Sequence, residues 1–177
     1  MLPQIVGMLQ PEGVQNMLPK QLGRLGFFLL FLAVPMSLKA APQDDAQKEQ
    51  EVRKVLSTFV DTWNRNEVKM SFGKLFTSDA DFVVLSGTYL KGRDQIVAHH
   101  VEIREGVYKD SHLVWNPVRV KFVRPDVAVA EVATEITYGQ EKRNTFATVV
   151  LVHENSQWLI ASMENTLIWG PDGPCPK

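Results

Sequence analysis

His100 is the residue best suited to acid–base chemistry in this sequence. Ile96, His100, Ile103 and Val107 recur at spacings of three and four residues, so they share one face of a predicted helix. An imidazole on an inward-facing stripe can serve as the general base or general acid of a pocket. The same position also suits a histidine at the edge of the core that bonds a backbone carbonyl. The sequence leaves both interpretations open.

The spacing of the histidines argues against a metal site. His99 and His100 are adjacent, so their side chains point about 100° apart around a helix and are poorly placed to coordinate the same metal ion. No HxH or HxxxH spacing occurs, and His112 would have to come from outside the helix. We expect His99 to face solvent. We expect neither a metal ion nor another cofactor.

Carboxylate and amide side chains in the predicted strands are the next candidates. A carboxylate that faces the protein interior has a shifted pKa and can act together with a histidine. Alternation along the strand places Glu131 and Glu135 opposite the apolar Val132, so we expect both carboxylates to face water. Glu164 and Asn165 are neighbours and point to opposite faces of their strand. Only one of that pair can therefore face an interior site.

Five aromatic residues could form the apolar wall of a ligand cavity. They are Trp63, Phe72, Phe82, Tyr89 and Trp115. Aromatic side chains suit such a wall because they offer large apolar surfaces, to which Trp and Tyr add one polar atom. The same residues also suit an ordinary core that needs no ligand. The choice between cavity and core stays open at this point.

No nucleophile for covalent catalysis is indicated. Ser57, Ser71 and Ser162 lack the GxSxG context of a nucleophile elbow. The single cysteine, Cys175, has no partner for an intrachain disulfide and no nearby histidine that would lower its pKa. We interpret it as a free thiol without a catalytic role.

Length and composition indicate one globular domain. The 177 residues are 45% hydrophobic and 22% charged, which is enough apolar material for a core without disulfides. The formal net charge is −1 and no block of Lys or Arg stands out. Because nucleic-acid binding needs a basic surface, we expect no nucleic-acid partner.

The N-terminal segment indicates export. Lys20 and Arg24 precede an apolar run over residues 25–38, and two alanines follow it. This pattern is typical of a secretory signal peptide, predicted here over residues 17–41, and residues 1–16 are interpreted as a dispensable or mis-assigned extension. We expect a secreted or periplasmic protein that meets a membrane only through an uncleaved leader. The alternative is a membrane anchor, although the run is short for a span of about 20 residues.

The predicted domain covers residues 42–170, and a flexible tail over residues 171–177 follows it. Apolar residues recur at i, i+3, i+4 and i+7 from residue 44 to residue 66, which predicts a helix buried on one face. A short second helix is predicted over residues 68–76. The helix that carries the two histidines is predicted to begin after Gly92.

The rest of the pattern favours strands. Asp79–Asp81 is predicted to be a turn before the first of them. Strands are predicted over residues 82–85, 88–90, 112–123, 127–138, 143–153 and 157–168. Because the breaks between the last four are short, we expect an antiparallel meander. Val118 and Val120 alternate with Arg119, which predicts a strand with one buried face and one solvent-exposed face. Pro117 predicts a bulge or bend in the same strand.

This order of elements is an α+β layout, and several motifs accompany it. They are FVDTWN at 59–64, LFTSDADF at 75–82, YLKGRDQI at 89–96, YKDSHL at 108–113 and WLIA at 158–161. In element order and motifs, the chain resembles the SnoaL-like (DUF4440-type) proteins of the NTF2-like superfamily, and within them the SgcJ/EcaC family. The resemblance spans about residues 45–168. It implies a cystatin-like cone in which about three helices pack on a strongly curved antiparallel sheet.

A bent sheet with helices on its concave side leaves a hollow, so we expect a small-molecule ligand in a pocket between helices and sheet. We also expect a homodimer. Proteins of this fold include isomerases, cyclases and dehydratases, so the expected activity is proton transfer on a small hydrophobic compound, with His100 as the central group. The family pattern favours Asn165 as pocket-facing. Steroid-isomerase relatives carry an acid on the strand after the second helix, where residues 82–87 offer none and Asp81 is the nearest substitute. The alternative is a non-catalytic, dimeric binding or assembly module.

Overall fold

The computed structural model of the protein describes residues 42–168. The helical elements are α1 (Pro42–Asn64), α2 (Val68–Ser71), the 3₁₀ turn η1 (Phe72–Leu75) and α3 (Arg93–Glu105). The strands are β1 (Phe76–Val83), β2 (Tyr89–Lys91), β3 (His112–Arg124), β4 (Val127–Tyr138), β5 (Glu141–Glu154) and β6 (Gln157–Leu167). The predicted extension 1–16, signal peptide 17–41, tail 171–177 and its cysteine lie outside the described residues.

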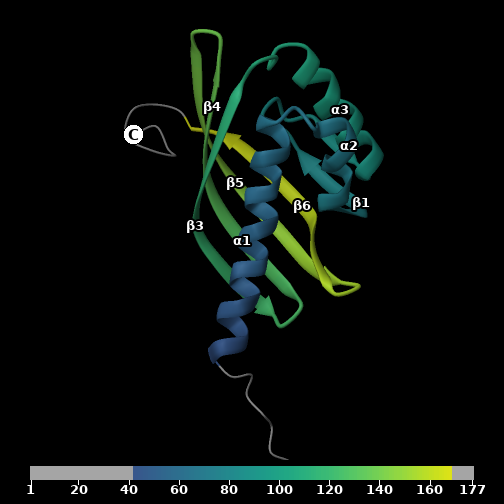
Figure 1. Ribbon diagram of the computed structural model, residues 1–177, viewed down its shortest axis with the longest axis vertical. Coiled ribbons are helices and arrows are strands. Elements are labelled where there is room, and N and C mark those ends of the chain that lie inside the picture. Colours follow the sequence, from purple (N-terminus) through teal and green to yellow (C-terminus); the bar gives the residue numbers. More distant parts are fainter. Residues whose placement is uncertain (1–41, 169–177) are drawn as a thin grey trace, which may run out of the picture. The chain divides into compact units, whose positions relative to one another are not determined.

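Within residues 42–168, six strands form one sheet in the order β2-β1-β6-β5-β4-β3. Neighbouring strands are antiparallel except β1 and β6, which run parallel. The meander predicted for the last four strands is confirmed, with boundaries within a few residues of those predicted. The predicted α+β fold is also confirmed, because helices pack on a curved, mostly antiparallel sheet (Figure 1).

Helix α1 crosses one face of the sheet, and α3 packs beside β1 (Figure 1). Val52, Leu56, Phe59 and Trp63 of α1 are all buried. They lie at i, i+4, i+7 and i+11, so a single stripe of the helix meets the sheet. The stripe ends at Trp63, near the C-terminus of α1. No helix in the described part of the chain is long and apolar enough to span a membrane.

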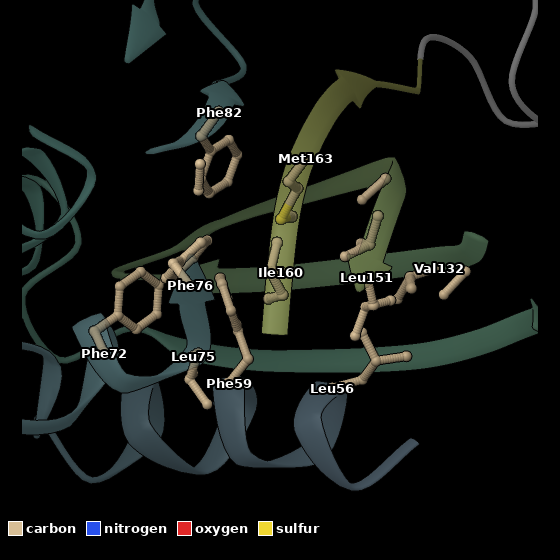
Figure 2. Close-up of a cluster of buried hydrophobic side chains, with 14 of the residues drawn as sticks. Leu56, Phe59, Phe72, Leu75, Phe76, Phe82, Val132, Leu151, Ile160 and Met163 are labelled. Atoms are coloured by element: carbon tan, nitrogen blue, oxygen red, sulfur yellow. The ribbon is translucent and has the colours of Figure 1, made fainter. Parts of the chain in front are cut away.

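The hydrophobic core lies between α1 and the sheet face that the helices cover. Figure 2 shows Leu56 and Phe59 of α1 directed toward strand side chains that include Leu151 and Ile160. The rings of Phe59 and Phe72 have centroids 4.6 Å apart, which ties η1 to α1. Burial of each such large apolar side chain stabilises the fold by about 2 kcal/mol. The helices are therefore held firmly against this face.

The prediction of a turn at Asp79–Asp81 is wrong, because β1 begins at Phe76 and runs through these residues. Asp81 pairs with Lys91 of β2 on one side and with Ser162 of β6 on the other. Pairing on both sides holds the backbone extended, so tertiary contacts override the local turn preference of Asp.

The bulge predicted at Pro117 is confirmed, because the β3–β4 register shifts between Pro117 and Arg119. Val118 is the extra residue of this bulge, and it is 61% exposed rather than buried as predicted. Strict alternation fails here because one added residue moves the side chains that precede it out of phase with those that follow. Val120 and the residues beyond it resume the alternation on β3.

Candidate functional site

A cavity with a volume of about 320 Å³ lies between α1, α3 and the sheet face that these helices cover. Its apolar wall includes Phe59 and Trp63 of α1, Phe82 of β1, Trp115 of β3 and Met163 of β6. The Phe59 and Trp115 rings stack with centroids 4.1 Å apart, so α1 and the edge strand β3 meet at the cavity. The volume suits a small organic molecule.

His100 lies in α3 with its ring in the cavity wall and only 4% of the residue exposed. Its Nδ1 lies 2.7 Å from the carbonyl oxygen of Ile96, one helical turn earlier. A carbonyl oxygen only accepts hydrogen bonds, so Nδ1 carries the proton and Nε2 keeps a lone pair. Both interpretations that the sequence left open for His100 therefore apply: one ring nitrogen is hydrogen-bonded to a backbone carbonyl, and the residue also lines a cavity.

Three aromatic rings surround the imidazole of His100. The ring centroids of Phe72 and Phe82 each lie 4.9 Å from it, and that of Trp63 lies 6.4 Å away. Burial among these rings lowers the pKa of His100 to about 4; the hydrogen bond to the backbone raises this pKa and the nearby His99 lowers it. His100 is therefore neutral at pH 7, and its Nε2 is free to accept a proton.

Three polar side chains of the sheet line the cavity without a hydrogen-bond partner in the described part of the chain. They are Thr134 of β4, Thr145 of β5 and Asn165 of β6. Thr134 lies directly opposite Thr145 on the neighbouring strand. Leu167 of β6 lies opposite Thr145 on the other side, and Asn165 is two residues from Leu167. All three polar side chains therefore share one face of the sheet. Each buried polar group left unpaired costs about 1–3 kcal/mol. The three groups form a polar patch suited to a ligand.

Asn165 was predicted to face the cavity, whereas neither threonine was. A signal for the threonines does exist in the strand alternation. Thr134 has the same parity as the buried Val132, and Thr145 has the same parity as the buried Val149. A hydroxyl at a core-facing strand position is a candidate binding group, because buried polar atoms ordinarily require a partner.

The wall around Trp63 is held in place by hydrogen bonds. Trp63 Nε1 donates to the hydroxyl of Ser111 at 3.0 Å. The next residue, Asn64, makes two bonds to the backbone of Leu113: its Nδ2 donates to the carbonyl at 2.9 Å, and its Oδ1 accepts from the amide at 2.8 Å. These bonds join the end of α1 to the start of β3, so the two walls of the cavity are positioned together.

The more accessible lining residues mark the mouth of the cavity. Ser86 and Arg143 are exposed, and His99 and Tyr108 are half-buried. The guanidinium carbon of Arg143 lies 5.3 Å from the ring centroid of Tyr138. Burial raises the pKa of Tyr108, and the charge of Arg143 opposes that shift. His99 borders the cavity instead of facing solvent as expected, because the cavity is wider than one stripe of α3.

Three predicted site residues lie outside the cavity. Phe72 is fully buried in the core behind the His100 ring. Tyr89 is 55% exposed, and its hydroxyl donates to the carboxylate of Asp81 at 2.6 Å, which raises the pKa of Tyr89. Asp81 precedes the cavity-lining Phe82 on β1, so strand alternation directs its side chain to the other face.

The remaining carboxylate candidates also lie away from the cavity. Glu131 forms an ion pair with Arg119, Glu135 forms one with Lys142, and Glu164 is exposed. This agrees with the strand parity that directs them to water. In residues 42–168, no group of three His, Cys, Asp or Glu side chains is arranged to hold a metal ion.

No protein-family model matches the sequence, and no curated protein sequence matches it. Among solved structures, a domain of unknown function with a cystatin-like fold from Nostoc punctiforme is 26% identical, with a TM-score of 0.64 over 73% of this chain and 80% of that chain. An NTF2-like protein with a cystatin-like fold from Novosphingobium aromaticivorans is 17% identical, with a TM-score of 0.63 over 73% of this chain and 88% of that chain.

A protein from Novosphingobium aromaticivorans that is provisionally named a scytalone dehydratase is 12% identical, with a TM-score of 0.63 over 75% of this chain and 91% of that chain. These likenesses concern the arrangement of the backbone. The chain therefore has the cystatin-like fold of NTF2-like proteins.

Proposed function

We propose that this chain binds a small hydrophobic carbonyl compound and catalyses a proton transfer on it, in an isomerase, cyclase or dehydratase type of reaction. The observation that carries the proposal is the state of His100. Its ring is buried in the cavity wall, its Nδ1 is anchored to a backbone carbonyl, and its pKa is lowered to about 4. A neutral imidazole with a free Nε2 is a general base at neutral pH.

The polar patch supplies the second half of the chemistry. When Nε2 of His100 takes a proton from the carbon beside a carbonyl, negative charge develops on the carbonyl oxygen. The unpaired hydroxyls of Thr134 and Thr145 can donate hydrogen bonds to that oxygen. Hydrogen bonds beside an apolar aromatic wall are stronger than those in bulk water.

The fold supports this choice of reaction class. A structural neighbour carries the provisional name scytalone dehydratase, and a second neighbour, from Streptomyces avermitilis, is provisionally named a dehydratase of the NTF2-like family. We further propose that the chain is a member of the SnoaL-like proteins, on the motifs given above. Export through the leader at 17–41 is part of the proposal, and N-terminal sequencing of the mature protein would reveal whether cleavage occurs near residue 41.

Deuterium exchange of a simple ketone tests the catalytic role without knowledge of the natural substrate. In D2O, the protein should accelerate exchange of the protons beside the carbonyl of 1-tetralone, measured by proton NMR. His100→Gln should reduce the acceleration by about 100-fold, because general-base catalysis contributes that much or more. His112→Gln, on an exposed histidine of β3, is the matched control and should exchange at the wild-type rate.

Equal exchange rates in wild type and in a folded His100→Gln variant would contradict the catalytic proposal. They would favour the second candidate, a non-catalytic dimeric binding or assembly module. A specific observation favours that candidate: β3 is an edge strand, and its Val118 and Val123 are 61% and 58% exposed. We propose a homodimer in either case, and light scattering that gave a monomer mass would contradict it.

A further inference from the structure

The cavity lining is positively charged. Among the described residues that line it there is no Asp, Glu or Lys, and Arg143 is the charged group, accompanied by His99 and His100. A site with a single fixed cation and no carboxylate attracts anions and repels cations, because the surrounding apolar wall screens the charge less than water does. The charge of the lining therefore selects among hydrophobic ligands.

Arg143 is held at the mouth by aromatic rings. Its guanidinium carbon lies over the ring of Tyr138, and Tyr138 in turn packs against Tyr108 edge-to-face, with centroids 4.9 Å apart. Arg143 forms no ion pair within residues 42–168. Stacking on a ring leaves the N–H groups of a guanidinium available, and their fork matches the two oxygens of a carboxylate.

A second arginine lies behind the wall. Arg104 is 7% exposed, and its bonds within the described structure go to neutral carbonyl oxygens, those of Trp63 at 3.3 Å and Tyr108 at 2.8 Å. Its guanidinium carbon lies 5.6 Å from the Trp63 ring centroid. A buried cation without a carboxylate partner adds to the positive potential on that side of the cavity.

An independent observation favours a ligand with polar atoms. Thr134 and Thr145 are 6% and 1% exposed, line the cavity, and have no hydrogen-bond partner in the described chain. The cavity thus offers neutral hydrogen-bonding groups on its sheet side, aromatic rings along its wall and a cation at its mouth. A ligand that satisfies all three has an apolar body, a neutral polar group and an anionic group.

We propose that the ligand of this cavity is a small apolar molecule with one carboxylate, which pairs with the guanidinium of Arg143 at the mouth. The apolar body lies against Trp63 and Trp115, and a neutral oxygen of the ligand meets Thr134 and Thr145. This inference rests on the proposed function, because it names the substrate class of the same site.

Matched pairs of neutral and anionic probes test this inference. Binding of naphthalene-2-carboxylate and naphthalene-2-carboxamide, and of benzoate and benzamide, is measured by calorimetry at neutral pH. The wild-type protein should bind each carboxylate at least about fivefold more tightly than its amide, which is the scale of a partly exposed charge pair. Arg143→Gln should abolish the preference while amide binding changes less than about twofold, and Arg143→Lys should keep part of it.

Lys142→Gln is the matched control, because it removes the same charge from the neighbouring residue of β5, whose side chain pairs with Glu135 instead of lining the cavity. It should retain the preference for carboxylates. Equal binding of both members of each pair by the wild type would overturn this inference and leave the pocket proposal standing. If the folded protein bound neither member of either pair, the pocket proposal would be overturned, and this inference with it.

Discussion

The two ring nitrogens of His100 have different surroundings, because within residues 42–168 Nδ1 is hydrogen-bonded to the backbone and Nε2 is not. The bond from Nδ1 to the Ile96 carbonyl fixes both the tautomer and the orientation of the ring. The rings of Phe72 and Phe82 disfavour its charged form. The result is a neutral ring in the cavity wall with a lone pair on Nε2. On the sheet side of the same cavity, the hydroxyls of Thr134 and Thr145 have no hydrogen-bond partner in the described structure.

A substitution at Thr145 tests whether its hydroxyl serves the fold or a ligand. Because Oγ1 has no partner in the described structure, Thr145→Val should leave the free energy of unfolding unchanged or raise it by up to about 1 kcal/mol. Ser111→Ala is the contrasting control: it removes the acceptor of the Trp63 indole N–H and should lower that free energy by about 1–2 kcal/mol. Urea denaturation measures both, and a larger loss for Thr145→Val than for Ser111→Ala would refute this assignment.

Among the contacts between elements, those that join the end of α1 to the start of β3 position the aromatic residues of the cavity. Asn64 closes this junction with one bond to the Leu113 carbonyl and one from the Leu113 amide. Trp63 of α1 and Trp115 of β3 lie on either side of this junction and line the cavity. The two bonds of Asn64 therefore help to fix the position of Trp63 relative to Trp115.

Replacement of Asn64 by Ala should open this junction. The variant loses two hydrogen bonds and leaves two backbone groups unpaired, so the free energy of unfolding should fall by about 2–3 kcal/mol. Asn116→Ala, at an exposed position of the same strand, is the control and should change it by less than about 0.5 kcal/mol. Thermal and urea denaturation compare the two. Equal stabilities for the two variants would show that the junction contributes nothing.

The elements themselves were predictable because their signals are local. The helical stripe that ends at Trp63 and the short breaks between the last four strands depend only on neighbours in sequence. The errors arose where distant partners decide. Asp81 is extended because β2 and β6 pair with it on either side. Val118 is exposed because it is the extra residue of the bulge after Pro117 and has no partner on β4.

The site was less predictable for the same reason. His100 could be selected by its residue type and position on a helix face. Arg143 and Thr145 come from a strand that follows His100 by more than forty residues, and only the folded sheet brings them to the same cavity. Whether an aromatic residue lines the cavity or fills the core, as Phe72 does, depends on packing that periodicity does not encode.

Across the whole molecule, charge is distributed unevenly. The chain has a formal net charge of −1, yet the cavity lining contains no carboxylate among the described residues and presents Arg143 at its mouth. Carboxylates such as Glu131 and Glu135 lie on the other side of the sheet, paired with basic residues. The fold thus separates paired carboxylates on the exterior from a cavity lining that carries a single arginine and no carboxylate.

The central claim is that a neutral His100 faces a ligand cavity, and an NMR titration of its ring nitrogens from about pH 3.5 to pH 8 tests it most directly. Because burial lowers the pKa of His100, the ring should stay neutral as the Nδ1–H tautomer at neutral pH and gain a proton only with a midpoint of about 4. Saturation with 1-tetralone should shift the Nε2 resonance. A midpoint near 6.5, the value of a solvated imidazole, or a proton on Nε2 at neutral pH, would contradict the account.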